Sequence, residues 1–440
     1  MRKTALVIRY SLISGLMFLV TAPAMGWQNT DVKERQWFQW RGPLANGVAP
    51  DATPPVSWSA DENIAWKVPV PGEGISTPIV WQDRVFLVSA VPTERIPERP
   101  PVKDERAMTS PPNRYFQFMV ICLDLKSGKT LWEDVCAELV PHEGRHKTSS
   151  YAAASPMTDG KRLIVPFGSF GIFSYSLEGQ QEWAIDLGDM HTRRGWGEAT
   201  SPVLVDDLVI MNWDNEDDSF LFALDAATGE VRWKVAREEP TTWATPLIIE
   251  RSGRKQVVTN GTNAIKGYDL KTGRELWKAS GTTLNAIPCP VEYKENVILM
   301  GGYRGNRAVS LHIGSDGEVR ENWELKKGTP YVPSPLLSGN RLYFTQSNKA
   351  ILHCVDAETG EYFYPPQRLS MLENLYGSPV MAHGHVYLSD RSGNTLVFKD
   401  SEKFEPVTTN SLEDQFDASP VPVEDCLLLR GKNLLYCIQK

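Results

Sequence analysis

The chain has 440 residues, a formal net charge of -8, and 41% hydrophobic, 10% aromatic and 23% charged residues. This charged fraction is close to that of globular proteins, so the composition excludes wholesale disorder. The acidic balance argues against a nucleic-acid-binding protein, which needs a basic domain or stripe. The 33 Gly and 31 Pro favour many short strands and tight turns over long helices.

Residues 1–26 predict an export signal. Three basic residues precede an apolar run from Leu12 to Ala22, and small residues follow it. That order is typical of a secretory signal peptide, and the run is too short for a membrane anchor, which needs about 20 residues. We expect cleavage between Ala24 and Gly26, no transmembrane segment afterwards, and no cysteine placed for lipidation. The expected location is therefore periplasmic or secreted.

Residues 63–440 repeat one pattern, in which a small residue and a proline precede a short apolar strand. The eight prolines are Pro78, Pro156, Pro202, Pro246, Pro290, Pro335, Pro379 and Pro420. After a first interval of 78 residues their spacing is 41 to 46 residues, which is typical of a β-propeller with four short strands per blade. The long first interval contains insertions near 92–114 and 137–150, whose composition predicts surface excursions. Residues 27–62 form an N-terminal extension.

The third unit shows the pattern inside each repeat. Its predicted strands cover 203–205, 208–212 and 220–224, and a turn over 225–229 leads to a fourth strand with Trp233. Asp and Thr side chains favour hydrogen-bonded turns, and Gly supplies the positive φ that they need. The outer-strand tryptophans, which we predict to be structural docking residues, are Trp66, Trp132, Trp183, Trp233, Trp277 and Trp323.

The two ends of the repeat region complement each other. Only 20 residues follow Pro420, enough for three strands. Residues 63–68 match an isolated fourth strand, since Trp66 precedes the next repeat proline by 12 residues, as Trp323 does. We therefore predict an all-β, eight-bladed propeller of four-stranded antiparallel blades, closed by the N-terminal strand in the C-terminal blade. We expect a monomer.

Residues 223–233, with the sequence ALDAATGEVRW, resemble the tryptophan-docking repeat of pyrroloquinoline quinone (PQQ)-type propellers. Residues 37–43 and 331–337 are similar to exported PQQ-like repeat proteins of planctomycete-type bacteria. The resemblance covers all eight units and identifies the chain as a member of the PQQ-like, BamB-like propeller family. It implies two functions that the fold alone does not separate, namely quinone-dependent dehydrogenases of alcohols or sugars and non-catalytic scaffolds.

The cysteine pattern favours the scaffold. The resemblance implies that a dehydrogenase would hold PQQ and calcium beside a catalytic carboxylate, often next to two adjacent cysteines. None of the six cysteines has a cysteine neighbour, and the chain has no Cys-x-x-Cys-His haem motif. No catalytic residue of those enzymes can be carried over. We therefore predict a scaffold without a cofactor that binds another envelope or extracellular protein and no nucleic acid; a PQQ- and calcium-dependent dehydrogenase is the alternative.

Two short motifs have the chemistry of cation ligands, yet neither predicts a metal site. Residues 142–146 match His-Glu-x-x-His, which binds zinc when both histidines share one helical face. Pro141 and Gly144 disfavour a helix, so we predict a solvated loop instead of a metalloprotease site. The acidic run 214–218 lacks the spacing of an EF-hand and predicts a hydrated turn.

The cysteines have structural explanations. Three of them share the small third-strand place that Ala223 holds in its own repeat, which predicts buried thiols in tight packing. These three are Cys122, Cys354 and Cys437. If residues 431–432 form a two-residue turn, Cys426 and Cys437 face each other across a hairpin. A cross-strand disulfide and two free thiols are then the alternatives in an exported protein.

The links into the first strands carry the candidate binding residues. Aromatic residues precede the small-Pro pairs, and two arginines lie in turns that we expect on the same face. These residues are Tyr151, Trp196, Trp243, Arg304, Tyr331, Tyr376, Arg391 and Phe416. Because this face surrounds the channel of a propeller, they predict an aromatic and cationic surface for a partner. The alternative is that several of them pack between blades.

Overall fold

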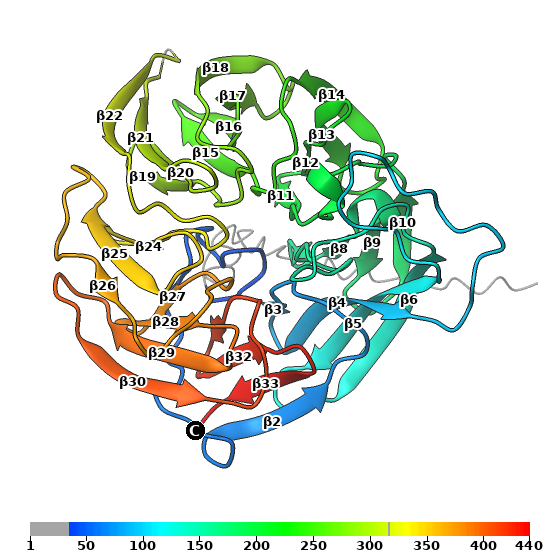
Figure 1. Ribbon diagram of the computed structural model, residues 1–440, viewed down its shortest axis with the longest axis horizontal. Helices are drawn as coiled ribbons and strands as arrows, with labels where there is room; N and C mark the ends of the chain where they lie inside the picture. The colour runs from blue at the N-terminus through cyan, green and yellow to red at the C-terminus, as the bar shows by residue number, and fades with distance from the viewer. Residues whose placement is uncertain (1–34, 316) are drawn as a thin grey trace, which may run out of the picture.

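The computed structural model describes residues 35–315 and 317–440, so the predicted signal peptide lies outside the described residues. Eight β-sheets stand around a central channel, and each blade has its first strand innermost (Figure 1). The strands within each blade pair antiparallel, as the third blade illustrates. The predicted all-β, eight-bladed propeller is therefore confirmed. Within the described ranges, no helix has the length and apolar character needed to cross a membrane.

The strands follow the predicted order in every blade. Blade 1 contains β3 (Ile79–Trp81), β4 (Arg84–Pro92), β5 (Phe116–Asp124) and β6 (Thr130–Leu139); blade 2 contains β7 (Met157–Thr158), β8 (Arg162–Pro166), β9 (Ile172–Ser176) and β10 (Gln181–Ile185). Blade 3 contains β11 (Val203–Val205), β12 (Leu208–Trp213), β13 (Ser219–Asp225) and β14 (Val231–Arg237); blade 4 contains β15 (Leu247–Arg251), β16 (Arg254–Thr259), β17 (Ala264–Asp269) and β18 (Glu275–Ser280). Blade 5 contains β19 (Val291–Tyr293), β20 (Asn296–Gly301), β21 (Arg307–Ile313) and β22 (Val319–Leu325); blade 6 contains β23 (Leu336–Ser338), β24 (Arg341–Thr345), β25 (Ile351–Asp356) and β26 (Gln367–Arg368). Blade 7 contains β27 (Val380–Ala382), β28 (His385–Ser389), β29 (Asn394–Lys399) and β30 (Pro406–Ser411); blade 8 contains β31 (Val421–Val423), β32 (Cys426–Arg430), β33 (Leu434–Ile438) and β2 (Ile64–Pro69). Besides these sets of four strands, the described residues form β1 (Val48–Ala49) and two short 3-10 helices, η1 (Gly168–Phe170) and η2 (Arg193–Gly195).

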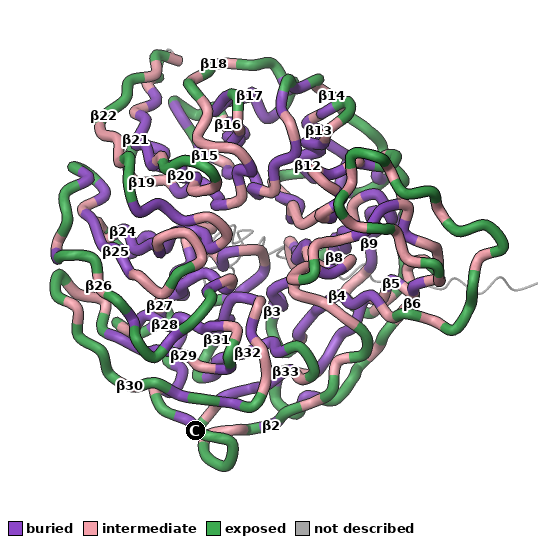
Figure 2. Tube along the Cα trace, viewed as in Figure 1, coloured by how far each residue is buried: buried purple, intermediate pink, exposed green. Residues whose placement is uncertain are grey.

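The middle strands of the blades form the core. Strands β12 and β13 are buried almost throughout, whereas the outer strand β14 alternates between exposed and less exposed residues (Figure 2). Neighbouring blades share apolar clusters, as where Ile210 of blade 3 and Tyr268 of blade 4 belong to one cluster. Because each blade buries apolar surface mainly against its two neighbours, an open ring would leave two faces in water.

The outer-strand tryptophans dock onto a turn of the next blade. The indole N–H of Trp233 donates to Leu270 O at 3.0 Å, and its ring covers Gly273. Gly273 has a φ of +70°, and a Cβ added there would lie 2.7 Å from the ring, so this turn requires glycine. The tryptophans with the same two contacts are Trp66, Trp132, Trp183 and Trp323.

Trp277 docks differently from the other five. Its indole N–H donates to Gln256 Oε1 at 2.7 Å, and its ring covers Gly267 in its own blade. In the matching turn of blade 5, a Cβ added to Gly317 would come near Leu276 O at 3.5 Å and would not meet the Trp277 ring.

The small residue of the third strand lies opposite the docking tryptophan of the fourth strand, as Cys122 lies opposite Trp132 in blade 1. Thus the predicted packing role of the small third-strand residues is confirmed for this buried cysteine.

Strand β2 closes the ring. It pairs antiparallel with β33, with Trp66 opposite Cys437 and Val68 opposite Leu435. The guanidinium of Arg430 reinforces the seam by donating to Ser76 O at 3.0 Å and to Val88 O at 2.7 Å in blade 1. The terminal segments of the propeller therefore complete one blade together, as the sequence predicts.

A ring of hydrogen bonds joins the blades just before their first strands. The hydroxyl of each Ser or Thr in the small-Pro pairs accepts a backbone N–H from the preceding blade, at 2.9 to 3.2 Å. The hydroxyl residues are Thr77, Ser155, Ser201, Thr245, Ser334, Ser378 and Ser419. Cys289 holds the eighth place, and its Sγ accepts the indole N–H of Trp40 at 3.1 Å. The small-Pro pairs thus connect the blades as well as starting their strands.

The N-terminal extension packs into the ring. Arg41 is 1% exposed, and its guanidinium donates to Pro335 O at 2.7 Å and to Pro379 O at 2.9 Å. Strand β1 pairs with β27 and adds a parallel fifth strand to blade 7. Figure 1 shows this dark blue segment passing the centre of the ring. The described part of the extension therefore shares the core of the propeller.

The last hairpin turns one residue later than predicted. A hydrogen bond of 2.8 Å spans residues 431–434, and the carboxylate of Asp414 accepts N–H groups of this turn and holds it from outside the hairpin. Cys437 consequently lies opposite Leu428 and diagonal to Cys426, so the predicted direct pairing of the two cysteines is wrong. Both cysteines are buried free thiols that contact each other.

Candidate functional site

Aromatic rings and arginines gather beside the channel on the face that carries the links between blades. Trp196 meets Tyr303 edge-on, with ring centroids 6.2 Å apart, and Tyr303 stacks on Tyr331 at 4.9 Å. The guanidinium of Arg304 lies 5.6 Å from the centre of the Tyr303 ring. Burial raises the pKa of Tyr331 above its usual range, although Asn285 donates a hydrogen bond to its hydroxyl. This packing joins links that are far apart in the sequence.

Tyr376 and Arg391 form the second part of this surface. The guanidinium of Arg391 lies 4.7 Å from the centre of the Tyr376 ring and pairs with the Asp417 carboxylate at 2.5 Å. The hydroxyl of Thr148 donates to the Tyr376 hydroxyl at 3.3 Å and so connects the second insertion to it. We call the whole set the aromatic mouth, which consists of Trp196, Tyr303, Arg304, Tyr331, Tyr376 and Arg391.

The other three predicted face residues occupy different places. Trp243 is half-buried, lines the channel and donates its indole N–H to Gly197 O at 2.7 Å. Tyr151 lies beneath the second insertion, where its hydroxyl donates to Glu143 O at 3.1 Å. Phe416 is 1% exposed and packs in the core on Tyr436, so its prediction as a face residue is wrong.

Sequence reasoning missed Tyr303, which contacts two predicted members of the mouth. The signal was present, because Tyr303 precedes Arg304 in the same turn between the second and third strands of blade 5. Tyr303 lies outside the links before the small-Pro pairs, where the other aromatic residues of the mouth occur, and its place beside Arg304 is the pattern that indicates it.

The second insertion is not the solvated loop that the sequence predicts. Glu143 is 5% exposed, and its carboxylate accepts hydrogen bonds from the backbone N–H and the hydroxyl of Thr192 at 3.0 and 2.6 Å. The His-Glu-x-x-His motif forms no helix, and the ring of His146 instead contacts Thr148 Oγ1 at 2.6 Å. The two histidines of the motif therefore do not form the site of a metalloprotease.

A small hollow with about 30 Å³ of free space lies under this insertion, between blades 2 and 3. We call it the inter-blade hollow; its lining includes Glu143, Glu198, Asn212, Asp214 and Trp243. Burial raises the pKa of Glu198 to about 8, and the nearby carboxylate of Glu143 adds to the shift. Burial also raises the pKa of Glu143. Two carboxyl groups thus share a poorly solvated space.

The acidic run beside this hollow is partly buried, so the predicted hydrated turn is wrong for its first two residues, Asp214 and Asn215. Both Asp214 and Arg237 have side chains that are 0% exposed, and their nearest charged atoms lie 2.6 Å apart. Although burial lowers the pKa of Arg237, the carboxylate of Asp214 raises it above its usual range. Arg237 therefore supplies the positive charge that balances the buried carboxylate of Asp214.

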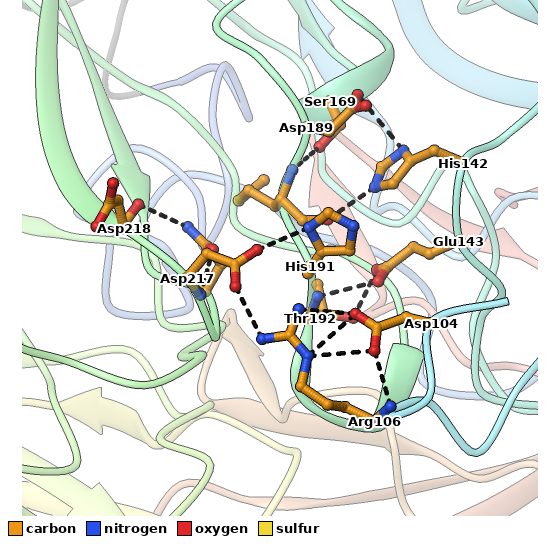
Figure 3. Close-up of polar contacts among 12 residues, drawn as sticks. Asp104, Arg106, His142, Glu143, Ser169, Asp189, His191, Thr192, Asp217 and Asp218 are labelled. Carbon is orange, nitrogen blue, oxygen red and sulfur yellow. Dashed lines mark hydrogen bonds and ion pairs between the residues drawn. The ribbon is translucent and has the colours of Figure 1, made fainter. Parts of the chain in front are cut away.

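The exposed end of the acidic run binds the first insertion. Arg106 pairs with Asp104 at 2.7 Å and with Asp217 at 2.8 Å, and the ring of His191 lies 2.8 Å from Asp217 (Figure 3). The hydrogen bonds from Arg106 hold the pKa of Asp104 at about 2. Both insertions consequently rest on the link between blades 2 and 3 and flank the aromatic mouth.

Known proteins and solved structures include relatives of this propeller. The model of a family described as outer membrane protein assembly factor BamB matches residues 51–206 and 116–364. Among solved structures, BamB from Moraxella catarrhalis is similar over 80% of this chain and 98% of its own, with 13% identity and a TM-score of 0.54. No curated protein matches the sequence.

Two dehydrogenases share the fold as well. A europium-containing methanol dehydrogenase is similar over 91% of this chain and 90% of its own, with 12% identity and a TM-score of 0.62. The quinohemoprotein alcohol dehydrogenase from Comamonas testosteroni covers 93% of this chain and 81% of its own, with 11% identity and a TM-score of 0.60. At these identities the structures show the fold alone, whereas the family model matches well over half of the sequence. The chain therefore belongs to the PQQ-like β-propeller family whose model is described as outer membrane protein assembly factor BamB.

Proposed function

We propose that this protein is an exported, non-catalytic scaffold of the cell envelope whose aromatic mouth binds another protein. The observation that carries the proposal is the packing of Trp196, Tyr303 and Tyr331 from separate blades into one partly exposed surface. Tryptophan, tyrosine and arginine are the residues that contribute most to protein–protein binding. The likeness to BamB, whose family is described as an assembly factor, supports the same kind of role.

The test uses the tagged mature protein as bait in an envelope extract of the source bacterium. We expect it to retain one partner protein, and we expect Tyr303→Ser and Tyr331→Ser each to weaken the purified complex at least about tenfold, as loss of a binding hot spot does. Tyr293→Ser is the matched control, because Tyr293 ends the first strand of the same blade 5 at its opposite end. Equal binding by all variants would contradict the proposal, as would the absence of a partner.

The second candidate is a PQQ- and calcium-dependent dehydrogenase of an alcohol or sugar, which the two dehydrogenases with the same fold favour. PQQ is a planar tricarboxylate that needs cationic or N–H partners. Among the described residues, the central cavity is lined by Asp417 and no basic side chain, and the basic residues Arg145, Lys147 and Arg391 line the adjoining hollow instead. Arg391, the nearest basic residue of the mouth, already pairs with Asp417.

Titration with PQQ and calcium separates the two candidates. The measurement follows tryptophan fluorescence and the reduction of an artificial dye in the presence of alcohols and sugars. The scaffold proposal expects no saturable binding and no turnover. Saturable binding together with turnover would reject it in favour of the dehydrogenase.

A further inference from the structure

Three side chains with metal-binding chemistry meet above the inter-blade hollow. His142 and Glu143 come from the second insertion, and Glu198 comes from the link between blades 2 and 3. One ring nitrogen of His142 and one carboxylate oxygen of each glutamate all lie within 4.8 Å of one another. Tetrahedral ligands at the usual distances of about 2.0–2.2 Å from one ion lie roughly 3.5 Å apart, so the three side chains would move closer together when they bind it.

The Glu143 carboxylate is held in place by its neighbours. Oε1 accepts the hydroxyl of Thr192 at 2.6 Å and Oε2 accepts its backbone N–H at 3.0 Å. The same hydroxyl oxygen accepts the N–H of Gly197 at 2.8 Å, which fixes Thr192 in turn. Partners of this kind orient the ligands of metal sites. Each oxygen keeps a further lone pair for an ion.

Glu198 leaves a buried acceptor without a partner. Its Oε2 accepts the N–H of Ser169 at 2.9 Å, whereas Oε1 is buried and has no hydrogen-bond partner among the described residues. A Cβ at Gly168 would come within 1.6 Å of Oε2, so the glycine makes room for this carboxylate. Since buried polar atoms in folded proteins are nearly always paired, this carboxylate oxygen is available to a hydrogen-bond donor or a cation.

Asn212 is a second residue of the inter-blade hollow with an unpaired buried oxygen. It is 2% exposed and lines the same hollow as both glutamates. Its amide nitrogen donates to Asp214 and Thr242, while its Oδ1 is buried without a partner among the described residues. The hollow therefore holds two unsatisfied buried oxygen acceptors and needs a donor or a cation to complete it.

The ring of His142 has a partner on each side. Nε2 donates to Met190 O at 2.8 Å, and Nδ1 lies 3.6 Å from Asp189 Oδ1. In the view of Figure 3, Asp189 lies on the side of the ring opposite Glu143. If an ion replaces the proton on Nε2, the ring proton moves to Nδ1 and Asp189 accepts it. A carboxylate behind a ligating imidazole is a recurrent arrangement in metal proteins.

We propose that His142, Glu143 and Glu198 bind one divalent first-row transition-metal ion, for which Zn²⁺ is the appropriate probe. One imidazole nitrogen with carboxylate oxygens is a donor set for zinc, whereas calcium and magnesium prefer oxygen alone. The ion would clip the second insertion to the link between blades 2 and 3, next to Trp196 of the aromatic mouth. This site is distinct from the channel, and it does not depend on the proposed partner binding.

The test uses the full mature protein, stripped with a chelator and then dialysed. Isothermal titration with ZnCl₂ and elemental analysis should give one tightly bound zinc per chain. His142→Ala and Glu198→Gln should each weaken zinc binding about 10- to 100-fold. His146→Ala is the matched control from the same loop, since its ring contacts Thr148 and lies outside the cluster; it should bind zinc as the wild type does.

The variants are first compared without metal by circular dichroism and thermal melting, so that loss of binding is not confused with loss of folding. If Glu198→Gln fails to fold, Glu198→Asp, which keeps the charge and shortens the reach, replaces it. Substoichiometric zinc in the wild type would overturn the proposal, and so would unchanged binding in His142→Ala. An equal loss in His146→Ala, or tighter binding of Ca²⁺ than of Zn²⁺, would overturn the ligand set or the metal class.

Discussion

Three buried arginines show how single residues place charge inside this ring. Arg237 meets the carboxylate of Asp214, whereas Arg41 and Arg430 donate to backbone carbonyls of other blades. Burial lowers the pKa of Arg41 to about 10 and that of Arg430 to about 9. The sequence does not reveal these partners, because Arg41 lies 294 residues from Pro335, whose carbonyl it binds.

The Asp214–Arg237 pair predicts a large loss of stability when one partner is removed. Asp214→Ala leaves a fully buried guanidinium without its carboxylate, which costs about 3–5 kcal/mol. Urea unfolding of the metal-free protein measures the effect. The control Asp218→Ala removes an exposed carboxylate from the same acidic run and should change stability by less than about 0.5 kcal/mol. Equal stability of the two variants would show that the pair is not structural.

His353 predicts a pH dependence of stability. The ring is 4% exposed and stacks on Phe344 at 5.0 Å, and burial lowers its pKa to about 4. Between pH 6.5, its usual pKa, and pH 4, the unfolded chain binds a proton that the folded chain resists, so stability falls as the pH is lowered. The loss reaches roughly 3 kcal/mol if the whole shift is realised.

Melting temperatures between pH 7 and pH 4 check this prediction. His353→Phe should make the acid side of the profile flatter than that of the wild type. His383→Asn is the control, since His383 lies exposed in a turn with a positive φ that asparagine tolerates. An unchanged slope in His353→Phe would exclude His353 as its source.

At the scale of the element, the structure follows the sequence wherever a strand or turn is encoded locally. The Asp-Thr-Gly turns and outer-strand tryptophans reveal the blades because each side chain contacts its own repeat or the next one. The last hairpin differs because Asp414, from the preceding link, fixes its turn. The second insertion differs for a similar reason, since Glu143 is buried by contact with Thr192, which lies 49 residues away.

Substitutions at two glycines distinguish the stability contributed by tryptophan docking from the cost of backbone strain. Gly273 and Gly253 both have positive φ, at +70° and +72°, but a Cβ at Gly273 meets the Trp233 ring at 2.7 Å, and one at Gly253 meets nothing within 4 Å. Gly253→Ala should therefore cost only backbone strain, about 1–2 kcal/mol. Gly273→Ala should cost about 1–3 kcal/mol more, because it displaces the tryptophan. Denaturant unfolding that found equal losses would show that docking contributes nothing.

At the scale of the whole molecule, eight similar repeats made the propeller ring predictable from the sequence. They did not predict how the extension and the insertions pack on it. Spacing alone gave the number of blades and the closing strand. The extension through Arg41 and the candidate metal ligands depend on contacts between segments without a shared pattern. The aromatic mouth was predictable only in part. Trp196 and Tyr331 were predictable because they lie in the repeated links before the blades, whereas Tyr303 contacts both of them from a turn within blade 5.

Ring closure gives the last prediction. A chain that starts at Val70 lacks β2, so β33 loses its partner strand and the turn of blade 1 loses the Trp66 ring. The exposed edge of β33 and the open side of blade 8 should make this protein unfold or aggregate. A chain that starts at Asn63 is the control, because it lacks β1 and Arg41 but keeps β2; it should remain a folded monomer with a lower melting temperature. Light scattering and calorimetry distinguish the two, and a monomeric, cooperatively melting Val70 chain would show that the blades hold together without their closing strand.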